Sequence, residues 1–173
     1  MSPKFDSRTI FFHWLSAALV LILWVAGQCI DLFPKGTPRV TVRSLHIVFG
    51  ILLAVTVVAR IIWRRTGGTH LPPADSGPMG KVAIGVHHLL YLLLVATVSM
   101  GATSYWLRAD TLFGLFSLTT FDPANKPLAH DMVELHGLLA NALFLLAGFH
   151  AAAALWHHWR LKDDVLQRML PKS

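Results

Sequence analysis

Cysteine and charge are both scarce in this chain of 173 residues. It holds a single cysteine, Cys29, and only 14% of its residues are charged, whereas 54% are hydrophobic. One thiol excludes an internal disulfide and any iron–sulfur cluster held by several cysteines. So little charge among so many apolar residues excludes an ordinary soluble domain and predicts a membrane protein.

Four apolar runs are long enough to cross a bilayer, which takes about 20 helical residues. They cover approximately residues 10–30, 44–63, 82–107 and 135–159. Pro34, Gly36 and Pro38 follow the first run and are expected to stop a helix there. The first run lacks a small-residue cleavage site, so we interpret it as a retained span and not as a signal peptide. The sequence predicts one all-α membrane domain over residues 1–173, a bundle of four transmembrane helices.

The longest connection, residues 108–133, contains the apolar segment LFGLFSLTTF. Such a segment is expected to lie on the membrane surface or to cap the bundle. The pattern leaves open whether it is helical.

Basic residues flank the four runs and account for the net charge of +6. Lipid headgroups therefore explain this charge better than nucleic acid does. An even number of spans places both termini on one side of the membrane. The same side holds the connection after the second span. With Arg60, in the last turn of that span, it carries ten of the fifteen Lys and Arg residues. The positive-inside rule predicts that both termini are cytoplasmic.

The fourth run is interrupted mainly by histidines, at positions 136, 150, 157 and 158. A helical step of fourteen residues leaves His136 and His150 roughly 40° apart on one face and about 21 Å apart along the axis. His46, near the start of the second run, matches the depth of His136, and His13 in the first run matches that of His150. The sequence thus predicts two bis-histidine sites, one toward each side of the membrane.

Two imidazoles at each site suit haem better than zinc. Zinc sites normally add carboxylates or thiolates, which the runs lack at these depths, whereas haem needs two axial nitrogens in an apolar slot. Small residues leave room for a flat macrocycle, namely Gly50, Gly137, Ala140 and Ala147. A membrane histidine can instead form a hydrogen bond between helices, but four that pair by depth favour ligation. We expect the bundle to enclose two b-type haems.

Two pairs of adjacent histidines offer a choice that spacing settles only in part. Neighbouring helical positions point about 100° apart, so at most one of each pair faces the bundle interior. His157 continues the histidine stripe of the fourth run and is favoured over His158. The same geometry does not separate His87 from His88.

Several short motifs are similar to those of a known family. They are HW at His13, LHIVFG around His46, HHLLYLLL from His87, and LHGLLANALFLLAGFHAAAALWHH over residues 135–158. Together they resemble the bacterial cytochrome b561 family of small di-haem membrane cytochromes, and more closely its superoxide oxidase members. The resemblance covers nearly the whole chain. It implies four spans in the bacterial inner membrane and two haem b groups.

The ligands that the resemblance implies are the four histidines paired above. His13 and His150 match those of the cytoplasmic-side haem, and His46 and His136 match those of the outer haem. The sequence leaves the catalytic side chains unassigned.

The resemblance also implies an activity, in which superoxide is oxidised at the outer face and ubiquinone is reduced at the cytoplasmic side. The family's quinone pocket includes histidines that match His87 and His157. Tyr91, four residues after His87, matches a family tyrosine and favours His87 over His88.

Three cations of the outer connection, Lys35, Arg39 and Arg43, are candidates for attracting the superoxide anion. Anchoring at the membrane surface explains them equally well.

Two other functions compete with superoxide oxidation. One is an electron-transfer cytochrome b subunit that accepts electrons from a protein partner and passes them to or from quinone. The other is a non-redox helical protein whose histidines serve packing or ion transport. The short connections offer little docking surface, which argues against the first. The resemblance implies superoxide and ubiquinone as partners, beside lipid, with no protein partner required.

Overall fold

The computed structural model describes residues 4–72, 77–117, 120 and 125–171. Within these residues the chain forms four helices that are long and apolar enough to cross a membrane. They are α1 (Ser7–Cys29), α2 (Thr37–Thr66), α3 (Pro78–Arg108) and α4 (Lys126–Trp156). This confirms the predicted all-α membrane fold.

Short elements complete the ends of the helices. A 3₁₀ turn, η1 (Ile30–Leu32), follows α1, and a π-helical turn, η2 (His157–Leu161), follows α4. The tail contains a second 3₁₀ turn, η3 (Gln167–Met169). After α3 come two short antiparallel strands, β1 (Thr111–Leu112) and β2 (Phe116–Ser117), in which Thr111 pairs with Ser117.

All four helices begin earlier than the apolar runs suggest, and α2, α3 and α4 each do so with a proline in the first turn. Pro38 lies within the first turn of α2 and Pro78 opens α3, while α4 begins at Lys126. The first-turn N–H groups have no partner inside a helix, so a proline costs nothing there. The expectation that Pro38 stops a helix was wrong for this reason. Asn125 caps α4 by accepting a hydrogen bond from the N–H of Leu128 at 3.1 Å.

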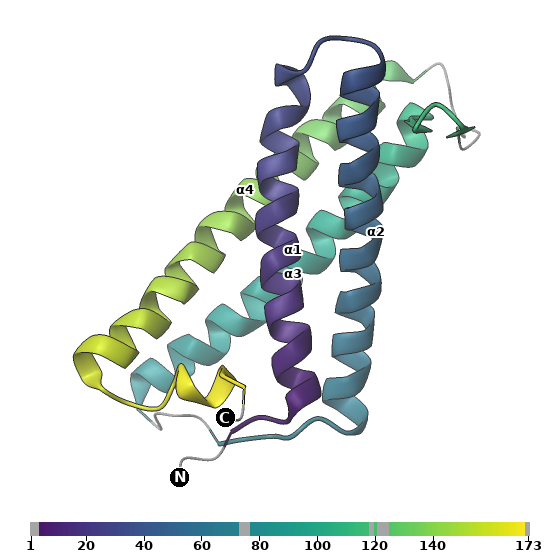
Figure 1. The fold of residues 1–173 in the computed structure, drawn as a ribbon. Helices are drawn as coiled ribbons and strands as arrows, with labels where there is room; N and C mark the ends of the chain where they lie inside the picture. The colour runs from purple at the N-terminus through teal and green to yellow at the C-terminus, as the bar shows by residue number, and fades with distance from the viewer. Residues whose placement is uncertain (1–3, 73–76, 118–119, 121–124, 172–173) are drawn as a thin grey trace.

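The helices form two antiparallel pairs, α1 with α2 and α3 with α4 (Figure 1). Both termini and the connection between α2 and α3 lie at one end, and the short strands lie at the other. A small apolar core joins the pairs at mid-height, consisting of Leu19, Leu23, Leu53, Val57, Leu94 and Leu143. Elsewhere large apolar side chains face outward; Leu92, Leu138 and Phe149 are each 66% exposed. So extensive an apolar surface suits contact with lipid.

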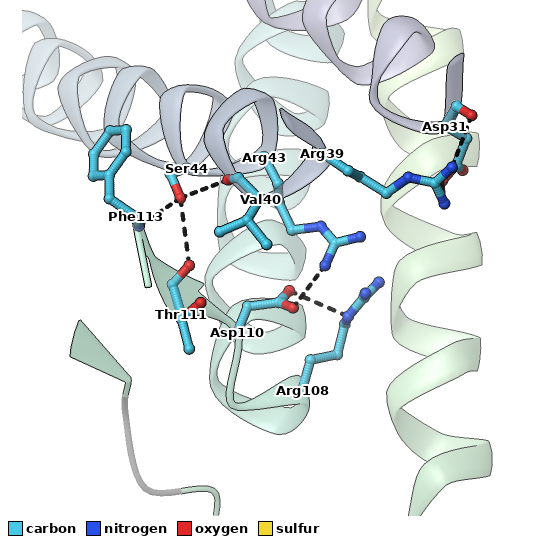
Figure 2. A network of polar contacts seen from close by, with 9 residues as sticks. All are labelled: Asp31, Arg39, Val40, Arg43, Ser44, Arg108, Asp110, Thr111 and Phe113. Carbon is cyan, nitrogen blue, oxygen red and sulfur yellow. Dashed lines mark hydrogen bonds and ion pairs between the residues drawn. The ribbon is translucent and has the colours of Figure 1, made fainter. Parts of the chain in front are cut away.

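The connection after α3 is joined to the N-terminal part of α2 through Ser44 (Figure 2). Ser44 is fully buried. Its hydroxyl accepts a hydrogen bond from the N–H of Phe113 at 2.8 Å and lies 2.7 Å from the carbonyl of Val40, to which it donates. The strands β1 and β2 therefore cap this end of the bundle, one of the two positions expected for the apolar segment. Much of its remainder, residues 118–119 and 121, lies outside the described residues.

At the opposite end, Asp6 links three segments. Its carboxylate accepts hydrogen bonds from the N–H and hydroxyl of Thr9 at the start of α1, from Nε1 of Trp63 in α2, and from the N–H of Thr69 beyond it. Burial by itself would raise the pKa of Asp6, but these hydrogen bonds outweigh it and lower the pKa below its usual range.

We expect Asp6→Ala to lower the free energy of unfolding by about 1 kcal/mol or more, because the cap and the links to α2 are lost together. Since folding lowers the pKa of Asp6, its contribution is present above the ordinary carboxyl pKa and is lost as the pH falls toward the folded-state value. Thermal unfolding in detergent, followed by circular dichroism at several pH values, measures both effects. Asp6→Asn keeps a capping oxygen and should lose mainly the pH dependence; an unchanged Tm for Asp6→Ala would contradict the role.

Candidate functional site

The structure brings four histidines together in the two pairs that depth predicts. The ring centres of His46 on α2 and His136 on α4 lie 6.1 Å apart, and those of His13 on α1 and His150 on α4 lie 6.3 Å apart. A metal ion bound at about 2 Å from each of two imidazole nitrogens holds the ring centres roughly 6 Å apart. Both pairs therefore fit bis-histidine ligation, and the ligand roles themselves stay a prediction.

We call His46 with His136 the outer pair and His13 with His150 the inner pair, after the sides of the membrane predicted for them. Within the outer pair, His136 is oriented by a neighbouring helix. Nδ1 of His136 lies 3.0 Å from the carbonyl oxygen of Thr97 on α3, so Nδ1 carries the proton and donates. This leaves the lone pair of Nε2 free for a metal, the usual arrangement of a ligating histidine.

Two glycines make room for the rings of this outer pair. A Cβ at Gly101 would lie 3.0 Å from Cε1 of His136, and one at Gly27 would lie 3.4 Å from Cε1 of His46. Neither glycine was predicted, because their contacts with the rings depend on which helix faces them. At Gly50 and Gly137 a Cβ would meet no atom within 4 Å, which agrees with the room expected there for a flat group.

A third histidine joins the inner pair. The ring centre of His87 on α3 lies 5.2 Å from that of His150, closer than that of His13. His87 and His88 are both exposed, and Nδ1 of His88 lies 2.8 Å from the carbonyl of Ile84 on its own helix. The arrangement favours His87, as the position of Tyr91 did.

Arg60 also belongs to the inner cluster, although it was predicted only as a charge that flanks the second span. Its Nη2 lies 3.3 Å from Nδ1 of His13, and its guanidinium carbon lies 5.1 Å from the ring centre of Tyr91. Arg60 follows His46 by fourteen residues, the step that separates His136 from His150. The same step in α2 therefore directs Arg60 to the inner site, and that spacing was a usable signal.

His157 stands at the point where α4 gives way to the π-helical turn η2. Lys162 adopts a left-handed conformation with φ 54°, which reverses the chain and brings Asp163 back toward His157. Nδ1 of His157 lies 2.5 Å from a carboxylate oxygen of Asp163. Within the described part of the chain, the structure gives His157 no ring contact with His87 or His150. Asp163 was not predicted, because a π turn followed by a left-handed residue cannot be read from helical spacing.

The pKa of Asp163 reflects this contact. Burial would raise it, but hydrogen bonds from His157 and from the N–H of Val165, together with the charges of His157 and Arg168, outweigh burial and lower it. Asp163 is thus held as a carboxylate beside the imidazole.

The three cations predicted at the outer face differ in their surroundings. Arg39 pairs with Asp31 at 3.1 Å (Figure 2). It also donates to the carbonyl of Phe33. Lys35 is exposed.

Arg43 shares a carboxylate partner with Arg108, the last residue of α3. Arg43 and Arg108 both pair with Asp110, at 3.0 and 3.2 Å (Figure 2). Two guanidinium groups on one carboxylate leave this cluster with a net positive charge. Arg108 was not among the predicted residues.

Comparison with known proteins identifies the family. The family described as prokaryotic cytochrome b561 matches residues 4–172. The chain belongs to this family. It is 33% identical to a probable superoxide oxidase CybB of Yersinia pestis, over 100% of this chain and 99% of that protein. It is also 36% identical to cytochrome b561 homolog 2 of Escherichia coli K12, over 94% of this chain and 88% of that protein.

A further relative, cytochrome b562 of Cereibacter sphaeroides, is 31% identical over 97% of this chain and 96% of its own length. Family membership confirms the resemblance found in the sequence. This cytochrome is accordingly a bacterial membrane protein of electron transfer with b-type haem as its cofactor.

We expect Gly101→Ala to lower the haem content of the protein. The added methyl group would overlap the ring of His136, which cannot retreat without breaking its hydrogen bond to Thr97, and overpacking of this kind costs about 1–3 kcal/mol. Haem content per chain and the optical difference spectrum measure the loss. Gly85→Ala on the same helix, where a Cβ meets nothing within 4 Å, is the control. Equal haem content in the two variants would show that His136 tolerates the methyl group.

Proposed function

We propose that this cytochrome oxidises superoxide at the outer face of the bacterial inner membrane and reduces ubiquinone at the cytoplasmic side. The observation that carries the proposal is the presence of two facing histidine pairs, whose members on α4, His136 and His150, lie fourteen residues apart along the helix. The name of the relative from Yersinia pestis supports superoxide as the electron donor. The excess of basic residues near the termini supports a cytoplasmic location for that end.

Each histidine pair would hold one haem, His46 with His136 at the outer site and His13 with His150 at the inner site. Haem bound in this way supplies one-electron redox chemistry across the bilayer. The chain supplies the orientation: Thr97 fixes the tautomer of His136, and Gly27 and Gly101 leave space for the two outer rings.

At the outer face, the chain's task is to attract an anion. Lys35, together with the net positive cluster of Arg43, Arg108 and Asp110, raises the local concentration of superoxide. Arg39 contributes less, because Asp31 neutralises it. Each superoxide anion loses one electron and leaves as molecular oxygen.

At the cytoplasmic side, the chain's task is to bind ubiquinone and to supply protons. Ubiquinone takes up two electrons, from two superoxide anions, and two protons to become ubiquinol. His87 and His157 are the proposed hydrogen-bonding partners of its oxygens. Asp163 acts as a positioning residue, because it holds Nδ1 of His157 and leaves Nε2 available to hydrogen-bond or to transfer a proton.

Purified protein tests the proposal directly. Mixed with enzymatically generated superoxide and a short-chain ubiquinone, it should form one ubiquinol for two superoxide anions and show two b-type haems per chain. His136→Ala and His150→Ala should each remove one haem, while His130→Ala, an exposed position on the same helix, should retain both. Two haems without superoxide-driven ubiquinol formation would instead favour a subunit that accepts electrons from a protein partner.

We expect Asp163→Asn to slow ubiquinone reduction several-fold while superoxide still reduces the haem at the normal rate. The amide cannot hold the imidazole as a charged acceptor does, so His157 loses both its orientation and its basicity. Stopped-flow measurement of haem reduction and reoxidation separates the two half-reactions. Asp164→Asn, a change of the neighbouring exposed carboxylate, serves as the control. A reoxidation rate equal in both variants would exclude the positioning role.

A further inference from the structure

Arg60 carries a positive charge within an apolar helix, on the side that faces the inner histidines. Its Nε atom is buried and has no hydrogen-bond partner. Within the residues that the structure describes, no carboxylate lies within 4.0 Å of it; its near neighbours are His13 and the ring of Tyr91. A cation at such a position normally pairs with an anion, because an uncompensated charge away from water is costly.

The contact with His13 is not a substitute for an anion. A guanidinium group has only donors, so Nδ1 of His13 must accept and the imidazole proton must sit on Nε2. A neutral imidazole in that tautomer has no lone pair on Nε2 for a metal. Ligation through Nε2 requires the proton to move to Nδ1, which then cannot accept from Arg60. Ligation by His13 through Nε2 therefore releases the guanidinium from this contact.

We propose that Arg60 is the carboxylate-binding residue of the inner site and pairs with a carboxylate of the haem held by His13 and His150. Haem b brings two carboxylates, and the planar fork of a guanidinium matches a carboxylate with two parallel hydrogen bonds. Tyr91 keeps the guanidinium in place by lying beneath its face. This inference rests on the inner haem of the proposed function.

The position of the charge has a redox consequence. A cation close to the inner site disfavours the more positive, oxidised state of the iron and so raises the midpoint potential. Within the described residues, the groups that face Arg60 from the neighbouring helices are His13 on α1, His87 and Tyr91 on α3 and His150 on α4, and none of them is an anion. Arg60 therefore favours passage of electrons from the outer pair toward the inner pair.

The experiment compares Arg60→Gln with wild-type holoprotein in two measurements. The first is a redox titration of both haems in detergent. The second is the redox-induced infrared difference spectrum of protein from cells fed 5-aminolaevulinate labelled at its carboxyl carbon, which places the isotope in the haem carboxylates. Arg65→Gln is the matched control, because Arg65 lies in the last turn of the same helix and is exposed.

We expect Arg60→Gln to lower the midpoint potential of the haem that His150→Ala removes, to leave the other unchanged, and to shift a label-sensitive carboxylate band. Arg65→Gln should change neither measurement. Unchanged label-sensitive bands in Arg60→Gln would overturn the pairing, even if a potential shifts. If this variant loses the inner haem, Arg60→Lys takes its place: the ammonium keeps the charge without the fork, so unchanged labelled bands would again overturn the pairing. Retention of both haems by His150→Ala would refute the ligand assignment instead.

Discussion

The distance across each histidine pair is the quantity on which the rest of this structure depends. Ring centres 6.1 and 6.3 Å apart are set by how α4 packs against the helices that carry its partners. A change in helix separation of even 1 Å would leave one imidazole out of reach of a shared iron. At the outer pair, Gly101 lets α3 lie close against the ring of His136, and Gly27 lies within contact range of the ring of His46. The small apolar core between the pairs holds the same separation at mid-height.

Polar contacts gather at the two ends of the bundle, where water or lipid headgroups are available. Asp6 joins α1, α2 and the following connection at one end, and the C-terminal tail returns to the same end through a hydrogen bond from Trp14 to the carbonyl of Met169. At the other end Ser44 and Asp110 attach the connection after α3 to α2. These contacts matter for the sites because Ser44 lies two residues before His46 and Asp163 lies at the start of the returning tail.

Arg60 and Asp163 show why part of the site escaped prediction. Both are ordinary flanking charges when the chain is considered one segment at a time. Spacing along α2 places Arg60 at the depth of the inner cluster. The packing of α2 against α1 and α3 then brings its guanidinium beside His13 and Tyr91. Asp163 reaches His157 only because the chain reverses at Lys162. The start of α4 at Lys126 was also missed, since its first turns are too polar to belong to an apolar run.

The sequence by itself determined the four helices, the placement of both termini at one end, and the depth at which each histidine lies. These follow from local properties, namely the length of apolar runs and the 100° turn of a helix, which do not depend on neighbours. Only the tertiary structure decided which glycine faces which imidazole and which carboxylate holds His157. Those features arise from the rotation and spacing of packed helices and from a single left-handed residue, and no periodicity within one segment encodes them.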